Sequence, residues 1–199
     1  AAGPQRFLFL DLHADQIQGF FNAPVDNLLP DTLIAEYIQS KNIEAQNIVI
    51  VTPDVGGARR ARRIAKIVGA KMALLDTRKE NGKYVSNVVG KIEECAIIID
   101  DIIDTGNRIV AASTQLKEHG AQRIFAWATH AVFSSDMQNV QDSCLDEVVV
   151  TDSIPVPEKK RFEKLRIQSI APLMAEAIRR IHNEESIQMF FTGPIQMTN

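Results

Sequence analysis

The sequence predicts a single α/β domain in which a doubly wound, mostly parallel sheet is flanked by helices. Short apolar runs rich in Val and Ile alternate along the chain with longer segments whose apolar residues recur every three to four positions. The first pattern is typical of buried parallel strands and the second of amphipathic helices, and their alternation indicates right-handed βαβ units. Such sheets bind ligands at the carboxyl ends of their strands, so the residues after each apolar run are the candidates for a site.

The composition narrows the class of protein. The chain has 199 residues, 45% of them hydrophobic, and a net charge of −3. This length suits one domain with a proper core and is short for two. The charge gives no reason to expect nucleic acid or an anionic membrane as a partner, and we expect neither a spanning segment nor a signal peptide. Cys95 opens an apolar run and is expected to be a buried thiol, which favours a reduced, cytoplasmic setting.

The elements follow from these patterns in chain order. In the first half we predict a strand over 6–13, a helix starting at Pro30-Asp31, a strand over 47–51, a helix over 58–68, a strand over 71–76, an exposed loop over 77–83 and a returning strand over 84–90. In the second half we predict a strand over 96–99, a helix over 109–116, strands over 123–130, 148–152 and 166–170, a charged connection over 155–164 and a last helix over 173–181.

The strongest pattern is a pair of carboxylates at the end of the strand over 96–99. Asp100 and Asp101 follow four apolar residues, three of them β-branched. Aspartates bind phosphate poorly, but they accept hydrogen bonds from a vicinal diol and they bind hydrated Mg²⁺. The loop after them, Asp104-Thr105-Gly106, leads into a helix whose first N–H groups have no intrahelical partners and therefore favour an anion. A diol beside a phosphate predicts a ribose 5-phosphate. The alternative is a plain strand–turn–helix in which Asp104 or Thr105 caps the helix.

Two further strand ends have polar residues that could bind a ligand. Asp11 and His13 follow the first apolar run, where the spacing of acid and imidazole is compatible with a metal or phosphate ligand as well as with a structural histidine. Asp54 stands with two glycines at the next strand-to-helix turn, where the backbone can approach a substrate. We expect all three strand ends to meet at one edge of the sheet. The basic residues Arg59, Arg60, Arg62, Arg63 and Lys66 are expected to form a solvated face or subunit contact, or else to bind a regulatory anion.

These segments resemble one enzyme family. Residues 100–106 are similar to the phosphoribosyl-binding loop shared by phosphoribosyltransferases and 5-phosphoribosyl 1-diphosphate synthetases, and residues 11–21, 52–57 and 175–180 resemble the synthetase specifically. The similarity runs from about residue 9 to residue 191. It implies a fold like that of the type I phosphoribosyltransferases, and it covers only the second half of a typical synthetase. We therefore expect one domain over 1–199, without the N-terminal domain of the family.

The resemblance implies a ribose-phosphate diphosphokinase, which transfers the diphosphoryl group of ATP to C1 of ribose 5-phosphate for nucleotide biosynthesis. It implies Mg²⁺ as cofactor, held by His13 and Asp54, and it implies that His13 also contacts the ATP phosphates. We expect Asp11 to be a further metal ligand. Asp100 and Asp101 would hold the ribose hydroxyls, and the 5-phosphate would lie on Asp104, Thr105, Gly106, Asn107 and Arg108. The family forms dimers that assemble into hexamers, so we expect a homo-oligomer, or else assembly with a separate synthetase chain.

Some positions depart from the family pattern. Asn107 and Arg108 stand where a glycine and a threonine are usual, Asn22 replaces an aspartate, and Thr77 replaces a catalytic lysine of the mobile loop. Arg78 and Lys79 are the candidates to supply the missing cationic contacts, whose loss would cost on the order of 10²- to 10⁵-fold in rate. Two alternatives therefore stay open. One is a catalytically impaired paralogue that regulates or assembles with a synthetase, and the other is a phosphoribosyltransferase.

Overall fold

The computed structural model describes residues 3–80, 83–188 and 190, and the side chains of all of these except 77–80 and 83–86. The strands are β1 (Phe7–Leu10), β2 (Val25–Leu28), β3 (Ile48–Thr52), β4 (Lys71–Glu80), β5 (Lys83–Val89), β6 (Cys95–Ile103), β7 (Arg123–Ala131), β8 (Glu147–Thr151) and β9 (Leu165–Gln168). The α-helices are α1 (Asp31–Ser40), α2 (Ala58–Val68), α3 (Asn107–Glu118), α4 (Gln138–Gln141) and α5 (Ala171–His182). Short 3₁₀ turns lie at η1 (Asp15–Phe20), η2 (Ala45–Asn47) and η3 (Glu158–Lys160).

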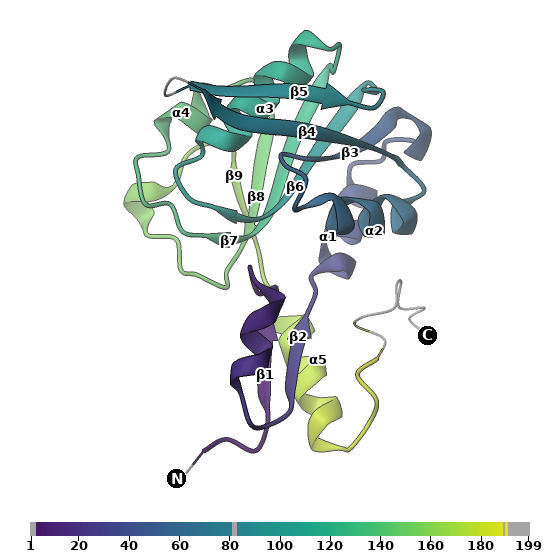
Figure 1. Ribbon diagram of the computed structural model, residues 1–199, viewed down its shortest axis with the longest axis vertical. Helices are drawn as coiled ribbons and strands as arrows, with labels where there is room; N and C mark the ends of the chain where they lie inside the picture. The colour runs from purple at the N-terminus through teal and green to yellow at the C-terminus, as the bar shows by residue number, and fades with distance from the viewer. Residues whose placement is uncertain (1–2, 81–82, 189, 191–199) are drawn as a thin grey trace.

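A seven-stranded sheet forms the main body, with the strand order β5-β4-β3-β6-β7-β8-β9 (Figure 1). All neighbouring strands in it are parallel except β4 and β5, which form an antiparallel pair. Within this sheet, the first strand in the chain is the inner strand β3. The next strands, β4 and β5, form one edge, and β6 to β9 follow in order on the other side of β3. This arrangement confirms the predicted doubly wound, mostly parallel sheet.

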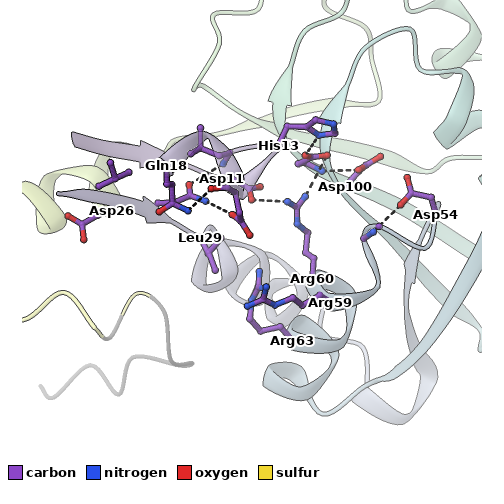
Figure 2. Close-up of a pocket in the computed structure, with 17 residues that line it drawn as sticks. Asp11, His13, Gln18, Asp26, Leu29, Asp54, Arg59, Arg60, Arg63 and Asp100 are labelled. Carbon is purple, nitrogen blue, oxygen red and sulfur yellow. Dashed lines mark hydrogen bonds and ion pairs between the residues drawn. The ribbon is translucent and has the colours of Figure 1, made fainter. Parts of the chain in front are cut away.

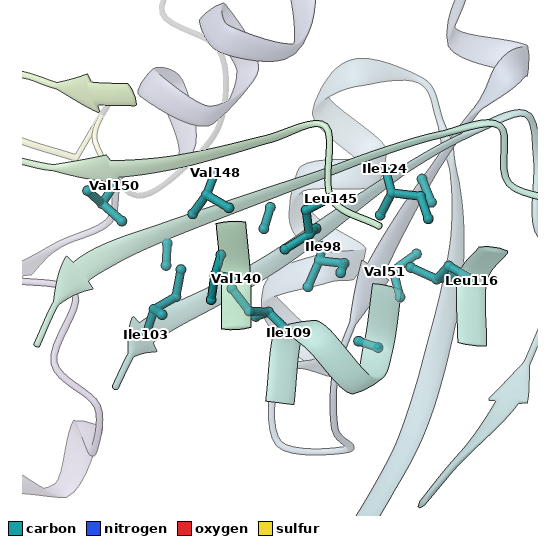
Figure 3. Packing of buried hydrophobic residues seen from close by; sticks show 14 of the residues in the cluster. Val51, Ile98, Ile103, Ile109, Leu116, Ile124, Val140, Leu145, Val148 and Val150 are labelled. Atoms are coloured by element: carbon teal, nitrogen blue, oxygen red, sulfur yellow. The ribbon is translucent and has the colours of Figure 1, made fainter. Parts of the chain in front are cut away.

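Two apolar cores lie on opposite faces of this sheet because successive strand residues point to opposite sides. Along β6, Ala96 and Ile98 belong to one core, and Cys95, Ile97 and Ile99 belong to the other. The first core is covered by α3 and α4 (Figure 3). The second core is covered by α1, α2 and α5. Both faces are therefore shielded from water, and this explains why β3 is buried at every residue and reads as an unbroken apolar run.

The first strand does not join the main sheet, contrary to the sequence prediction. β1 pairs in parallel with β2 in a separate two-stranded sheet, which lies beside α5 and away from the seven-stranded sheet in Figure 1. All four residues of β1 are half-buried, whereas those of β3 are fully buried. An apolar run of four residues predicts a strand but says nothing about its neighbour, so the pairing with β2 was not accessible from the pattern.

Two other predictions need correction. The exposed loop predicted over 77–83 is wrong for residues 77–80 and 83, because β4 continues to Glu80 and pairs with β5 in an antiparallel ladder from Leu74↔Val89 to Glu80↔Lys83, and residues 81–82 lie outside the described part of the chain. The central strand also runs further than expected: β6 ends at Ile103, so both aspartates after Ile99 lie within it. The prediction that Cys95 is a buried thiol is confirmed. Within the part of the chain described here, no helix is both long and apolar enough to cross a membrane.

Candidate functional site

A cleft of about 630 Å³ opens where three segments meet (Figure 2). These segments are the chain after β1, the turn between β3 and α2, and the end of β6, and residues of β2 and α2 complete the walls of the cleft. The carboxylates predicted at these three positions, Asp11, Asp54 and Asp100, all line it. The main sheet supplies two of these segments and the small β1–β2 sheet supplies the third. The meeting of the three strand ends is thus observed, although β1 reaches the cleft from outside the main sheet.

An ion-pair network joins the first segment to β6. His13 Nδ1 lies 2.6 Å from Asp101 Oδ2, and because a carboxylate accepts, the imidazole N–H donates. Arg60 Nη2 donates to Asp11 Oδ1 at 2.8 Å, and Arg60 Nη1 lies 3.9 Å from Asp101 Oδ1. Burial works to raise the pKa of Asp101, but His13, Asp100 and Arg60 outweigh it, so this pKa lies below its usual value. Asp101 is therefore ionised at neutral pH and orients both partners.

The orientation of His13 suits a ligand in the cleft. Its side chain is 70% exposed, and donation from Nδ1 leaves the lone pair of the neutral ring on Nε2. A carboxylate that accepts from one ring nitrogen while the lone pair of the other faces a metal is the usual support of a metal-ligating histidine, whereas contact with a phosphate would require Nε2 to carry a proton as well. The role of His13 at a metal or phosphate stays a prediction.

Asp11 is held in a different environment. Its side chain is 1% exposed, and besides the Arg60 contact, Oδ2 accepts a hydrogen bond from the Thr129 hydroxyl. Burial raises the pKa of Asp11 despite Arg60 and Thr129. Both of its oxygens thus already have protein partners. This favours a structural role, fastening the chain after β1 to α2 and β7, over the predicted role as a metal ligand.

The two adjacent aspartates of β6 differ in protonation. Burial and the neighbouring Asp101 carboxylate raise the pKa of Asp100 well above its usual value. The backbone N–H of Asp101 donates to Asp100 Oδ1 at 3.0 Å. One carboxylate of the pair is thus ionised and the other is shifted towards its protonated form. Together they can accept hydrogen bonds from, and donate one to, the neighbouring hydroxyls of a sugar.

The turn after β3 brings its backbone close to the cleft. Asp54 Oδ1 accepts a hydrogen bond from the N–H of Gly57 at 2.9 Å. A Cβ atom at Gly57 would lie 2.0 Å from Thr52 Oγ1, so only glycine fits against this strand end. The Asp54 side chain remains 39% exposed. Asp54 has one oxygen not used by the turn, and its role at a metal stays a prediction.

The loop from Asp104 to Arg108 surrounds a smaller cavity of about 140 Å³. Gly106 precedes α3 at φ +76°, and a Cβ there would lie 2.4 Å from Val140 Cγ2. Asn139 Nδ2 donates to the Thr105 carbonyl at 3.1 Å and to Asn107 Oδ1 at 2.8 Å. These contacts from α4 hold the loop against the N-terminus of α3, where the free N–H groups favour an anion.

Arg108 reaches out of this loop towards the neighbouring turn. Its Nη2 forms an ion pair with Asp54 Oδ2 and lies 3.9 Å from Asp100 Oδ2. Burial lowers the pKa of Arg108, although a guanidinium remains charged throughout the physiological range. This contact could not be predicted from a local pattern, because 54 positions separate the two residues.

The remaining candidates have different outcomes. Arg78 and Lys79 lie on β4, and their side chains are outside the described part of the structure, so their catalytic role stays a prediction. The histidine at the end of the strand predicted over 123–130, His130, hydrogen-bonds to Ser153 Oγ at 2.9 Å and to the carbonyl oxygens of Leu10 and Asp11 at 3.2 Å, which is a structural role. Arg60 lines the cleft, although the sequence predicted a solvated face, a subunit contact or a regulatory anion site for the basic residues of this helix. The signal for a place at the cleft was its position directly before the buried Ala61 on α2.

The carboxylates do not form a metal cage by themselves. Among the residues that the structure describes, no group of three or more His, Cys, Asp and Glu side chains is arranged to hold a metal ion. Mg²⁺ usually keeps several waters and binds through one or two carboxylates together with substrate phosphates. Asp54 Oδ2, once Arg108 shares or releases it, would together with the exposed His13 ring fit Mg²⁺ delivered with a phosphate.

Comparison with known proteins identifies the family. The model of the "Phosphoribosyl synthetase-associated domain" matches residues 70–192. The chain is 47% identical over 199 residues to a ribose-phosphate pyrophosphokinase of Pasteurella multocida (strain Pm70), covering 96% of this chain and 62% of the relative. It is 45% identical over 195 residues to the ribose-phosphate pyrophosphokinase of Bacillus subtilis (strain 168), covering 96% of this chain and 61% of the relative.

A solved structure agrees with this result. The crystal structure of phosphoribosylpyrophosphate synthetase from Mycobacterium smegmatis superimposes with a TM-score of 0.82 at 37% sequence identity. The match covers 92% of this chain and 60% of that one. The chain thus spans less than two thirds of the length of the relatives it matches. On the family model, the sequence identity and the shared fold, this chain belongs to the phosphoribosyl synthetase (ribose-phosphate pyrophosphokinase) family.

Proposed function

We propose that the chain carries the ribose 5-phosphate and Mg²⁺ sites of a ribose-phosphate pyrophosphokinase, which transfers the diphosphoryl group of ATP to the C1 hydroxyl of ribose 5-phosphate. The observation that carries this proposal is the convergence of His13, Asp54 and the Asp100–Asp101 pair on one cleft beside the Asp104–Arg108 loop. Acids for a diol, an anion-binding helix N-terminus and a metal-binding turn are the parts that hold the sugar phosphate and the metal in such a reaction. The family relationship supports the same reading.

The chain's own residues have distinct roles in this proposal. The backbone N–H groups at the start of α3 bind the 5-phosphate, and Asp100 and Asp101 hold the ribose hydroxyls. Asp54 and His13 hold Mg²⁺, which neutralises phosphate charge when it is bound. Arg59 and Arg60 line the cleft and add positive charge to one wall. These residues orient the C1 oxygen towards the β-phosphorus of ATP, where a new O–P bond forms as the bond to the α-phosphate oxygen breaks and AMP leaves.

Such a reaction depends on positioning and charge neutralisation more than on covalent chemistry from the protein. This is consistent with a cleft whose carboxylates and guanidinium groups are suited to orienting substrates and neutralising charge. We propose ATP and ribose 5-phosphate as substrates, Mg²⁺ as cofactor, a dimer or hexamer as the working assembly and the cytoplasm as its location. We propose these properties for the whole protein and not for this chain alone.

Calorimetric titration with ribose 5-phosphate and with ATP, each with Mg²⁺, followed by an assay for AMP release, tests the proposal. We expect both ligands to bind and AMP to form in proportion to 5-phosphoribosyl 1-diphosphate. Sugar-phosphate binding without AMP release would instead support the regulatory or assembly paralogue. Failure of both ligands to bind would contradict the proposed function.

A further inference from the structure

Arg108 stands between the two cavities of the site. The guanidinium comes from the first turn of α3 and lines the smaller cavity together with Asp100. Its partner Asp54 lines the larger cleft, which Asp100 also borders. The ion pair between Arg108 and Asp54 therefore joins the wall of the anion cavity to the wall of the metal cleft.

The contact uses the one Asp54 oxygen that the turn leaves available. Oδ1 accepts the N–H of Gly57 at 2.9 Å, and Oδ2 is paired with Arg108 Nη2. A cation that approaches Asp54 through Oδ2 meets a guanidinium already in place. Metal binding at Asp54 thus requires Arg108 to leave or to share the oxygen, and either change costs part of the metal affinity.

The ion pair is weak enough for Arg108 to exchange Asp54 for another anion. The side chains of Arg108 and Asp54 are 40% and 39% exposed, and pairs with this much contact with water contribute little to stability. A phosphate group can accept two parallel hydrogen bonds from a guanidinium, which is stronger than a partly exposed contact with one carboxylate oxygen. The smaller cavity beside Arg108 lies at the helix N-terminus, where such an anion is favoured.

We propose that Arg108 acts as a latch that couples the two sites: it holds Asp54 in the free protein, and a sugar phosphate in the smaller cavity draws its guanidinium away and frees Asp54 for Mg²⁺. The proposal rests on the proposed function for the identity of its ligands. By linkage, Mg²⁺ must then strengthen sugar-phosphate binding by the same factor as the sugar phosphate strengthens Mg²⁺ binding. The residue acts on affinity and on binding order, and it needs no role in the chemical step.

Titration calorimetry with Mg²⁺ on the whole protein tests the latch, with Arg108→Gln compared with the wild type. Without sugar phosphate, we expect Arg108→Gln to bind Mg²⁺ about two- to tenfold more tightly, because Gln removes the competing charge. With saturating ribose 5-phosphate, the difference should shrink. Inorganic phosphate serves as a second probe, since it fills the anion site but has no ribose hydroxyls that could contact the metal directly.

Arg59→Gln is the matched control, because Arg59 lines the same cleft and the substitution removes the same charge. A general electrostatic effect would tighten Mg²⁺ binding equally in both variants, and this result would overturn the latch. Equal Mg²⁺ affinities for Arg108→Gln and the wild type would also overturn it. If no form binds sugar phosphate, the proposed function fails, while the Mg²⁺ titrations without sugar still decide whether Arg108 competes for Asp54.

Discussion

His13 and Asp101 lie 88 positions apart in the chain and meet through a hydrogen bond of 2.6 Å between Nδ1 and Oδ2. This contact joins the segment after β1 to the end of β6. It also places the imidazole over the cleft with Nε2 free for a ligand. Since β1 is not in the main sheet, His13 and the neighbouring Arg60–Asp11 pair are among the contacts that bring the small sheet to the site.

Asp101→Asn is expected to weaken ribose 5-phosphate binding by about 10- to 100-fold, because hydrogen bonds to a charged acceptor contribute about 1.5–3 kcal/mol each. The substitution also removes the charged partner of His13 and one of the two carboxylates near Arg60. Calorimetric titration with ribose 5-phosphate and Mg²⁺ measures the change. Asp142→Asn is the control, since Asp142 is exposed and does not border the cleft. Unchanged affinity in Asp101→Asn would remove Asp101 from the sugar site.

Arg60→Met is expected to lower the free energy of unfolding by about 3–5 kcal/mol, because it leaves the carboxylate of Asp11 buried and without its cation. Methionine keeps most of the side-chain volume, so the loss reports the charge pair. Urea unfolding followed by circular dichroism measures it. Arg62→Met on the same helix is the control, and because Arg62 is exposed we expect a change of about 0.5 kcal/mol or less. Equal effects in both variants would contradict a structural role for the Arg60–Asp11 pair.

Gly106→Ala is expected to destabilise the protein by about 2–4 kcal/mol and to abolish sugar-phosphate binding. The alanine would be held at φ +76° with its Cβ 2.4 Å from Val140, so backbone strain and overpacking add together. Gly120→Ala separates the two causes: Gly120 has φ +98°, but nothing lies within 4 Å of its Cβ position, so strain alone should cost about 1–2 kcal/mol. Urea denaturation of both variants measures the difference, and similar losses would contradict a tight fit at Gly106.

Glu147 is expected to make stability depend on pH in the acid range. Burial works to raise its pKa, but hydrogen bonds from Lys41 at 2.7 Å and Tyr37 at 2.9 Å outweigh it, so the folded-state pKa lies below the usual value. A lowered pKa stabilises the fold above the unfolded-state value of about 4.3, and this contribution is lost as the pH falls through the lower folded-state value.

The comparison of the wild type with Glu147→Gln isolates this contribution. The stability advantage of the wild type, measured by urea unfolding, should be constant above about pH 6 and should shrink between about pH 5 and pH 3. Glu158→Gln is the control, since Glu158 is exposed and its ion pair with Arg161 is on the surface. An advantage that stays constant down to pH 3 would show that Glu147 is not stabilised by its partners in the ionised form.

The sequence predicted the parts of the site that depend on local patterns. The apolar runs of β3 and β6 and the helical periodicity of α2 and α3 follow from burial on both faces of a parallel sheet. The acids after these runs had to reach the same edge, because parallel strands end together. This is why Asp54 and the Asp100–Asp101 pair could be assigned to one cleft from the sequence.

Other features depend on contacts between distant segments, and the hydrophobic periodicity of the sequence does not predict such contacts. The pairing of β1 with β2 was not predicted, and neither was the extension of β4 and β5 into a ladder, because a strand pattern does not name its neighbour. Arg60 was expected on a solvated face, in a subunit contact or at a regulatory anion site, because charged residues on a helix usually face water. In the folded chain it is satisfied by two carboxylates contributed by other segments.

The sequence by itself therefore determined the doubly wound fold, the family and the residues at the strand ends, since these rest on local burial patterns and short motifs. Only the tertiary structure decided which side chains pair across the site. His13 with Asp101, Arg60 with Asp11 and Arg108 with Asp54 are pairs separated by 49 to 88 positions. The physical reason is that a charged side chain has many possible partners in a sequence, and packing selects the one within reach.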